Sequence, residues 1–255
     1  MTRTIAISNQ KGGVAKTTTC LSLGACLAEM KQSVLLIDLD PQAHLTVSLG
    51  VKPEKLRRAV DDALLGYTSL VSVSRESSIL GLDIVPASRM LIVLDKILYG
   101  QKDYQFHLKR GLEAMGQDFY DFVLIDCPPS FNTLTLNGLA AADMLIIPVQ
   151  CDYYAAYSLR YYIKMIHQVR EKMNPWLTYQ VLVTMYDRRN KVCQVILDQM
   201  QRGLNSTLFE TIIEIDTKLR ESPAFSQPIT LYAPKTRGTE QYRALAKELM
   251  NHGKR

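Results

Sequence analysis

The sequence predicts an α/β protein in which helices flank a doubly wound, mostly parallel sheet. Three observations carry this prediction. Six short β-rich or continuously apolar runs lie along the chain, at residues 4–9, 33–40, 82–87, 122–129, 144–149 and 179–186. Longer segments with helical spacing separate them, and this alternation is typical of parallel β-α-β units. Polar segments follow several of the runs, where parallel sheets bind ligands beyond the carboxyl ends of their strands.

Length and composition set the limits of the prediction. The chain has 255 residues, of which 47% are hydrophobic and 22% charged, and it carries a net charge of +5. We expect a single domain over 1–255, with no separate N-terminal DNA-reading domain because the first strand begins at residue 4. No apolar run approaches the roughly 20 residues of a membrane-spanning helix. Five cysteines without a C-x-x-C pair indicate buried thiols and a cytoplasmic location.

The first strand, 4–9, runs into the sequence SNQKGGVAKTTTC at residues 8–20. This segment is similar to a phosphate-binding loop, and helical spacing follows it to about residue 30. The standard pattern G-x-x-x-x-G-K-[ST] has glycine at the positions of Gln10 and Ala15, so only the Lys-Thr pair matches as written. The loop is therefore either a coincidence or a variant.

Each part of this loop suits a bound nucleotide. Backbone N–H groups at a helix N-terminus cradle phosphate oxygens. Lys16 is expected to neutralise β- and γ-phosphate charge, and the Thr17 hydroxyl is expected to bind Mg²⁺. The residues expected to contact ATP are Lys11, Gly12, Gly13, Val14, Ala15, Lys16, Thr17 and Thr18.

Carboxylates end two further strands. The run at 33–40 finishes with Asp38 and Asp40, and the run at 122–129 contains Asp126. A carboxylate at a strand end could hold Mg²⁺ directly or through a water molecule, and Asp126 is the natural candidate. The alternative, in which each aspartate only caps a helix or turn, stays open.

Helical spacing extends over 54–65, 108–116, 153–173 and 191–204, and again near the end of the chain. The helix at 153–173 is rich in tyrosine and would suit base stacking, but its apolar spacing favours packing against the sheet. In the last helix, Leu245, Leu249 and Met250 form an apolar seam that would dock on the domain.

With these residues assembled, the chain resembles the ParA/MinD group of deviant Walker A P-loop ATPases, and within it the ParA partition ATPases. The matching segments follow one another nearly from end to end. They are KGGVAKT (11–17), DLDPQ (38–42), IDCPPS (125–130), PVQ (148–150), TMYDRR (184–189) and LYAPKTRGTEQYRALAKEL (231–249).

The resemblance implies a slow, Mg-dependent ATPase that forms a homodimer when ATP is bound. Lys11 would reach across the dimer interface to the phosphates of the other subunit. Asp40 would position the attacking water, and Asp38 would support Mg²⁺ and catalysis. With Lys16, these are the catalytic candidates, and Thr17, Asp38 and Asp126 are the metal candidates. Two departures from the family are Ala15, where glycine is usual, and Ala43-His44, where Gly-Asn is usual.

The resemblance also implies non-specific DNA binding in the ATP state, with a nucleoid-associated cytoplasmic location. A ParB-type or other adaptor protein would stimulate hydrolysis, and the cargo would be a plasmid, a chromosome or a protein assembly. Clustered cations that contact phosphates give salt-sensitive binding without a base code. The candidates are Arg188, Arg189, Lys191, Lys218 and Arg220, with Arg237 as a further one.

Three other functions stay open. A MinD-like ATPase would cycle on a membrane through a basic amphipathic C-terminal helix, which the tail does not resemble. A redox ATPase of the nitrogenase iron-protein kind would need a second cysteine partnering Cys127. A metabolic ATP-dependent enzyme on the same fold is disfavoured by Lys11 and by the D-P-Q segment.

Overall fold

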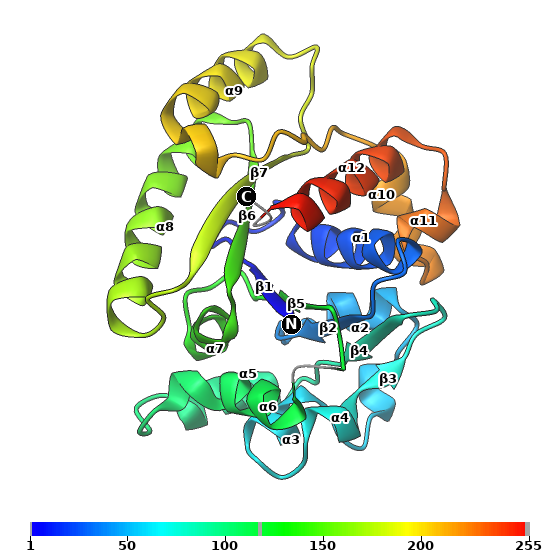
Figure 1. Cartoon of the computed structure of the whole chain (residues 1–255), viewed down its shortest axis with the longest axis vertical. Helices are drawn as coiled ribbons and strands as arrows, with labels where there is room; N and C mark the ends of the chain where they lie inside the picture. Colours follow the sequence, from blue (N-terminus) through cyan, green and yellow to red (C-terminus); the bar gives the residue numbers. More distant parts are fainter. Residues whose placement is uncertain (1, 117–118, 253–255) are drawn as a thin grey trace.

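The computed structural model describes residues 2–116 and 119–252, and its seven strands form one sheet (Figure 1). The order across the sheet is β3-β4-β2-β5-β1-β6-β7, and all neighbouring pairs are parallel except β3 with β4. This confirms the predicted fold class. The strands are β1 (Arg3–Ile7), β2 (Val34–Asp38), β3 (Arg75–Glu76), β4 (Leu82–Val85), β5 (Phe122–Asp126), β6 (Met144–Gln150) and β7 (Thr178–Thr184).

Six of these strands lie at the six runs that the sequence singles out. Every residue of β2 and of β5 is buried, because helices cover both faces of the sheet and leave no polar side. Successive side chains of β1 enter opposite cores, with Ile5 and Ile7 in one cluster and Ala6 in the other. The sequence gives no sign of β3, since two exposed residues have no pattern to detect.

Helices form a layer on each face (Figure 1). The helices of the first layer pack in the hydrophobic core that includes α1, and those of the second layer pack in the core that includes α8. The first contains α1 (Lys16–Glu29), α2 (His44–Ser48), α10 (Thr217–Glu221), α11 (Ile229–Tyr232) and α12 (Arg237–Asn251). The second contains α3 (Val60–Leu64), α4 (Leu70–Val73), α5 (Leu91–Leu98), α6 (His107–Met115), α7 (Thr133–Ala141), α8 (Tyr153–Lys172) and α9 (Lys191–Leu204). Short 3-10 turns are η1 (Pro53–Lys55), η2 (Tyr104–Phe106), η3 (Asn205–Thr207) and η4 (Ser222–Phe225).

One predicted helix is interrupted. The segment 54–65 folds as η1, an extended stretch, and α3 instead of one helix. The backbone of Ala59 is extended, with φ −145°, and its N–H donates to the Asp62 carboxylate over 2.9 Å. This local bond starts a new helix at Val60, which overrides the helical spacing around it.

Helix α8 packs on the sheet as expected, but four of its tyrosines do not. Its buried face includes Tyr162, whereas the other tyrosines of the helix point away from the core. The exposed ones are Tyr153 (69%), Tyr154 (76%), Tyr157 (55%) and Tyr161 (52%). The expectation of packing is therefore right for the helix and wrong for these four side chains.

The last helix, α12, docks on α1 through fully buried Leu245 and Leu249, and Met250 packs beside them, as the apolar seam predicts. All five cysteines are unpaired, and four of them are buried. Within the described ranges, no helix combines the length and apolarity needed to cross a bilayer. The single domain over 1–255 stays a prediction.

Candidate functional site

The segment between β1 and α1 lies at the carboxyl edge of the sheet, where side chains from β6 and β7 hold it. The Gln150 amide donates to the carbonyl of Gly13 over 3.0 Å, and the Thr184 hydroxyl donates to the carbonyl of Val14 over 3.1 Å. Asn9 accepts the N–H of Lys11 at 3.0 Å and donates to the carbonyl of Pro148 at 2.8 Å. The sequence reasoning missed Asn9, Gln150 and Thr184 as loop supports, although each stands at the carboxyl end of a predicted strand.

The loop has the shape of an anion site. Gly13 and Ala15 both have positive φ, at 74° and 64°. Helix α1 begins at Lys16 without an acidic residue in its first turn or a side-chain cap. A Cβ built on Gly12 or Gly13 would meet no described atom within 4 Å. The loop therefore has open space beside its two glycines and leads into a helix N-terminus whose first N–H groups have no cap, an arrangement that attracts phosphate.

Lys16 is the buried cation of the loop, with 8% of its surface exposed. Its ammonium group donates to the carbonyl of Lys11 over 3.0 Å. Burial lowers its pKa, and the nearby carboxylates of Asp126 and Asp40 oppose this shift. The side chain thus lies between the loop and the carboxylates of Asp126 and Asp40, and its contact with nucleotide phosphates stays a prediction.

Asp38 and Asp126 lie opposite each other in adjacent strands, and Asp126 is also in register with Ile7 at the end of β1. Both Asp126 carboxylate oxygens are buried and meet no hydrogen-bond partner among the described atoms. Burial, reinforced by the charge of Asp38, raises the Asp126 pKa well above its usual range, and the nearby Thr17 hydroxyl lowers it. Two orphaned carboxylate oxygens beside a hydroxyl fit a hard cation.

No group of three or more His, Cys, Asp or Glu side chains that could hold a metal exists within the described part of the chain. Mg²⁺ does not need such a cage, because it is usually held by one or two carboxylates together with nucleotide phosphates and water.

Asp38 and Asp40 have different surroundings. Asp38 is fully buried and accepts three bonds, from the Thr46 hydroxyl (2.7 Å), the Thr46 N–H (2.9 Å) and the Asp40 N–H (3.0 Å). Burial raises the pKa of Asp38 to about 7. Asp40 accepts the N–H of Gln42 on Oδ1, whereas its Oδ2 has no hydrogen bond to any described residue. Asp38 thus fixes the loop that carries Asp40, and Asp40 retains a free oxygen.

Lys11 lies on the outer side of the loop and forms an ion pair with Asp152. The distance from its Nζ to Asp152 Oδ2 is 2.6 Å, and the two side chains are 32% and 41% exposed. Asp152 is also the N-cap of α8, since it accepts the N–H of Ala155. The sequence gives no indication of this partner.

A slot of about 330 Å³ opens beside the loop at Gly13, Ala15 and Thr18. Its other walls come from Met185 just after β7, from the segment before α10, from α10 itself with Arg220, from η4, and from α12. Wall residues not anticipated by the sequence reasoning include Met185, Ile215, Asp216, Leu219, Pro223 and Tyr242. The mixed apolar and polar lining suits a flat heteroaromatic group next to the phosphate loop.

The predicted DNA-contacting cations lie around the loop after β7, α10 and the start of α12, and most have carboxylate partners. The bonded pairs are Arg188–Glu214 (3.5 Å), Arg189–Asp187 (3.0 Å), Lys218–Glu221 (2.7 Å) and Arg237–Glu214 (3.0 Å). Lys191 and Arg220 are exposed and have no ion pair with any residue that the structure describes.

Comparison with known proteins agrees with this geometry. An AAA domain model matches residues 2–179. The chain is 38% identical to the sporulation initiation inhibitor protein Soj of Bacillus subtilis, over 99% of this chain and 100% of Soj. It is also 38% identical to the chromosome partitioning protein ParA of Myxococcus xanthus, over 97% of this chain and 88% of that protein.

Among solved structures, cobyrinic acid a,c-diamide synthase from Mycobacterium smegmatis with bound ADP and magnesium is similar, with a TM-score of 0.87. The identity is 36%, and the match covers 100% of this chain and 96% of the other. Identity to Soj and ParA over nearly the whole chain, together with the loop and with Asp38, Asp40 and Asp126 beside it, shows that the chain belongs to the ParA family of partition ATPases.

Proposed function

We propose that this protein is an ATP-dependent switch. It binds Mg-ATP, dimerises, attaches to DNA without sequence preference, and returns to the monomer when ATP is hydrolysed. The observation that carries the proposal is the meeting of Lys11, Lys16, Asp40 and Asp126 around one loop at the carboxyl edge of the sheet.

ATP fits the two parts of the site. The N–H groups of 12–16 and the Lys16 ammonium receive the phosphates, and the 330 Å³ slot receives the adenine ring. The similar M. smegmatis structure binds ADP and magnesium, which supports the same ligands here. Thr17 and Asp126 hold Mg²⁺, and Asp38 contributes by fixing their neighbour Asp40. The ion supplies charge neutralisation at the phosphates.

The chain's own groups perform the hydrolytic step by positioning and by charge. Asp40 uses its free oxygen to accept a hydrogen bond from the attacking water and so holds that water in line. Lys16 stabilises negative charge that develops on the γ-phosphoryl group, and Lys11 of the other subunit adds a second cation. Because the phosphates need that cation, dimerisation depends on ATP.

DNA attachment follows from dimerisation. A dimer has twice the cationic surface of one subunit. Phosphate contacts that are too weak singly then hold the dimer on DNA together. Arg220 and Lys191 are the strongest candidates because they have no competing carboxylate within the described residues. A ParB-type or other adaptor accelerates hydrolysis and releases the DNA. We place the protein on the nucleoid in the cytoplasm and its cargo among plasmids, chromosomes or protein assemblies.

A metabolic ATP-dependent enzyme is the second candidate, because the similar M. smegmatis structure is named as an amide-forming synthase. Co-sedimentation separates the possibilities. The chain is mixed with random-sequence DNA, or with anionic vesicles, in ATP, ADP or no nucleotide. ATP-specific recovery with DNA supports the proposal. Recovery with vesicles indicates a MinD-like membrane cycle, and recovery with neither favours the metabolic enzyme.

A further inference from the structure

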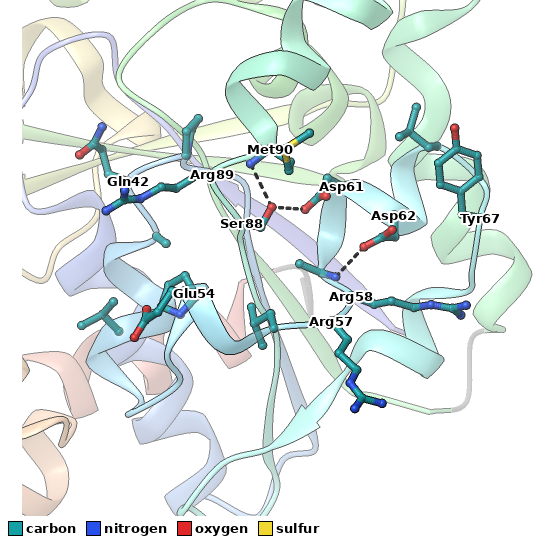
Figure 2. A pocket seen from close by; sticks show the side chains of 17 residues that line it. Gln42, Glu54, Arg57, Arg58, Asp61, Asp62, Tyr67, Ser88, Arg89 and Met90 are labelled. Atoms are coloured by element: carbon teal, nitrogen blue, oxygen red, sulfur yellow. Dashed lines mark hydrogen bonds between the residues drawn. The ribbon is translucent and has the colours of Figure 1, made fainter.

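A second and larger cavity, of about 670 Å³, lies beside the segment that follows Asp40 (Figure 2). One wall is the loop Pro41–Gln42–Ala43, and another runs from η1 to the first turn of α3. The turn between β4 and α5, with Ser88, Arg89 and Met90, closes the remaining side. We call this cavity the α3 cleft. Its volume lies in the range of specific ligand sites.

The α3 cleft is held open by bonds between its walls. The Ser88 hydroxyl donates to Asp61 over 2.7 Å, and the N–H of Val60 donates to the carbonyl of Pro86 over 2.9 Å. Asp62 accepts the N–H of Ala59. Figure 2 shows Asp61 and Asp62 turned toward these donors. The walls are therefore fixed before any partner arrives, which lowers the entropic cost of binding.

Three arginines line the cleft with their guanidinium groups unbonded. Arg57, Arg58 and Arg89 are exposed, and none has an ion pair or side-chain hydrogen bond to the residues at 2–116 or 119–252. Arg89 extends toward Gln42, whereas Arg57 and Arg58 extend away from the centre of the cleft (Figure 2). The lining also includes apolar side chains, among them half-exposed Val47 and Met90.

One wall of the α3 cleft is hydrogen-bonded directly to Asp40, the residue that we propose positions the attacking water. The N–H of Gln42, in its wall, donates to Asp40 Oδ1 over 2.9 Å. The next residue, Ala43, has a left-handed backbone with φ 54°, which is unfavourable for alanine. A group that displaces Gln42 would release or turn the Asp40 carboxylate.

We propose that the α3 cleft binds an acidic peptide segment of a partner protein, with carboxylates on the three arginines and an apolar side chain between them, and that this contact adjusts Asp40 through Gln42. Planar guanidinium groups pair with carboxylates in bidentate fashion. The regulatory half of this proposal rests on the proposed ATPase function, whereas the docking half does not.

The lining favours a peptide over nucleic acid. Three arginines are balanced by Glu54, Asp61 and Asp62, so the formal charge of the cleft is near zero. A continuous line of phosphates would meet those carboxylates, and non-specific DNA sites depend on a net cationic surface. A peptide can instead place isolated carboxylates on the outward arginines and leave Glu54 in solvent.

Display selection tests the docking half. Random 12-residue peptides are selected on the full chain and counter-selected on R57E/R58E/R89E. We expect the survivors to be rich in Asp and Glu with at least one large apolar residue. A synthetic survivor should bind the triple variant at least about tenfold more weakly by fluorescence anisotropy. The matched control, R75E, changes an exposed arginine outside the cleft and should bind as wild type.

Absence of enrichment, enrichment of non-acidic sequences, or equal binding to the triple variant would overturn the docking site. Loss of random-sequence DNA binding by the triple variant, without acidic survivors, would assign the arginines to nucleic acid and also overturn it. Retained thermal melting of the variant separates these results from unfolding.

Turnover tests the regulatory half. The saturating peptide should change the rate of ATP hydrolysis by wild type at least about twofold and leave ATP affinity unchanged, because Asp40 acts on the water and not on the nucleotide. The triple variant should hydrolyse ATP at the basal rate and ignore the peptide. A bound peptide without effect would refute the coupling to Asp40. A chain that hydrolyses no ATP would instead refute the proposed function, while peptide binding still decides the docking site.

Discussion

The Lys11 ammonium lies 2.6 Å from the Asp152 carboxylate of its own chain. In the proposed function, this lysine contacts the phosphates bound by the other subunit of the dimer. Partial burial raises the pKa of Asp152, but the hydrogen bond and charge of Lys11, together with the backbone N–H groups of Ala155 and Tyr154, outweigh burial and lower the pKa. The pair must therefore separate before Lys11 can act in trans, and dimerisation competes with an internal ion pair.

Asp152→Asn should strengthen the ATP-dependent dimer. The amide keeps the cap on α8 but no longer holds Lys11 as an ion pair. A half-exposed pair contributes roughly 0.5–1 kcal/mol, so the dimer dissociation constant should fall about two- to fivefold. Analytical ultracentrifugation with a non-hydrolysable ATP analogue measures this. Glu171→Gln, an exposed charge removal on the same helix, is the control, and an unchanged or weaker Asp152→Asn dimer would contradict the competition.

A trans role for Lys11 predicts complementation between two inactive variants. Lys11→Ala and Asp40→Ala should each lose hydrolysis alone, with Asp40→Ala still binding ATP. In a mixed dimer, one site keeps its own Asp40 and receives Lys11 from the other subunit. Random pairing should then restore about a quarter of wild-type turnover in an equal mixture. If the mixture stays inactive although mixed dimers form, Lys11 acts within its own subunit.

Binding of Mg-ATP should tighten as the pH rises. Burial raises the pKa of Asp38 to about 7 and that of Asp126 well above its usual range, so both hold protons at low pH. Metal binding needs the charged carboxylate and releases its proton. Affinity should therefore increase by up to about tenfold per pH unit below the Asp126 pKa.

Calorimetric titration of Mg-ATP at pH 6, 7 and 8 measures this dependence. Asp126→Asn should bind Mg²⁺ weakly and flatten the profile, while nucleotide binding in EDTA should differ little between the two proteins. A wild-type affinity that falls with rising pH would rule out Asp126 as the metal ligand.

Two alanines take the left-handed backbone at positions where the family resemblance leads us to expect glycine. Ala15 has φ 64° and Ala43 has φ 54°. Ala15→Gly should stabilise the chain by about 0.5 kcal/mol, because relief of roughly 1 kcal/mol of strain exceeds the entropy that glycine adds to the unfolded state. Urea denaturation measures the change. Ala28→Gly, within α1, should instead destabilise by about 1 kcal/mol, and a destabilised Ala15→Gly would mean that the loop tolerates the methyl group.

Arg220→Ala should weaken DNA binding more than Arg189→Ala. Arg189 makes two bonds to Asp187, so its charge is already compensated, whereas Arg220 has no such partner in the described chain. Arg220→Ala should also lower the slope of log affinity against log salt by about one. Fluorescence anisotropy on random-sequence DNA with ATP tests this, with Lys96→Ala on α5 as the control. Equal losses for both arginines would show that the Asp187 pair opens on DNA.

The sequence predicts where the site residues lie along the chain and which strands carry them, but not the hydrogen bonds that they make. Asp38 and Asp126 can be expected to meet because parallel strands end at one edge, and the register confirms it. The sequence does not predict which of these carboxylates keeps oxygens free of hydrogen bonds. Thr46, on a separate helix, donates to Asp38, whereas no described residue donates a hydrogen bond to the buried oxygens of Asp126. The metal role of Asp38 stays a prediction for that reason.

The sequence by itself determined the strand runs, the variant loop and the order of the family's motifs, because apolar periodicity and glycine spacing are local properties of the chain. Only the tertiary structure decided the Lys11–Asp152 pair, the slot beside the loop and the α3 cleft. Each of these joins residues that are far apart in sequence, for example Lys11 with Asp152, and no local pattern encodes such distances. The interruption of the helix at 54–65 has a different, local cause, the bond from the Ala59 N–H to the Asp62 carboxylate. The four exposed tyrosines of α8 lie away from its buried face, and only the packed structure shows which face is buried.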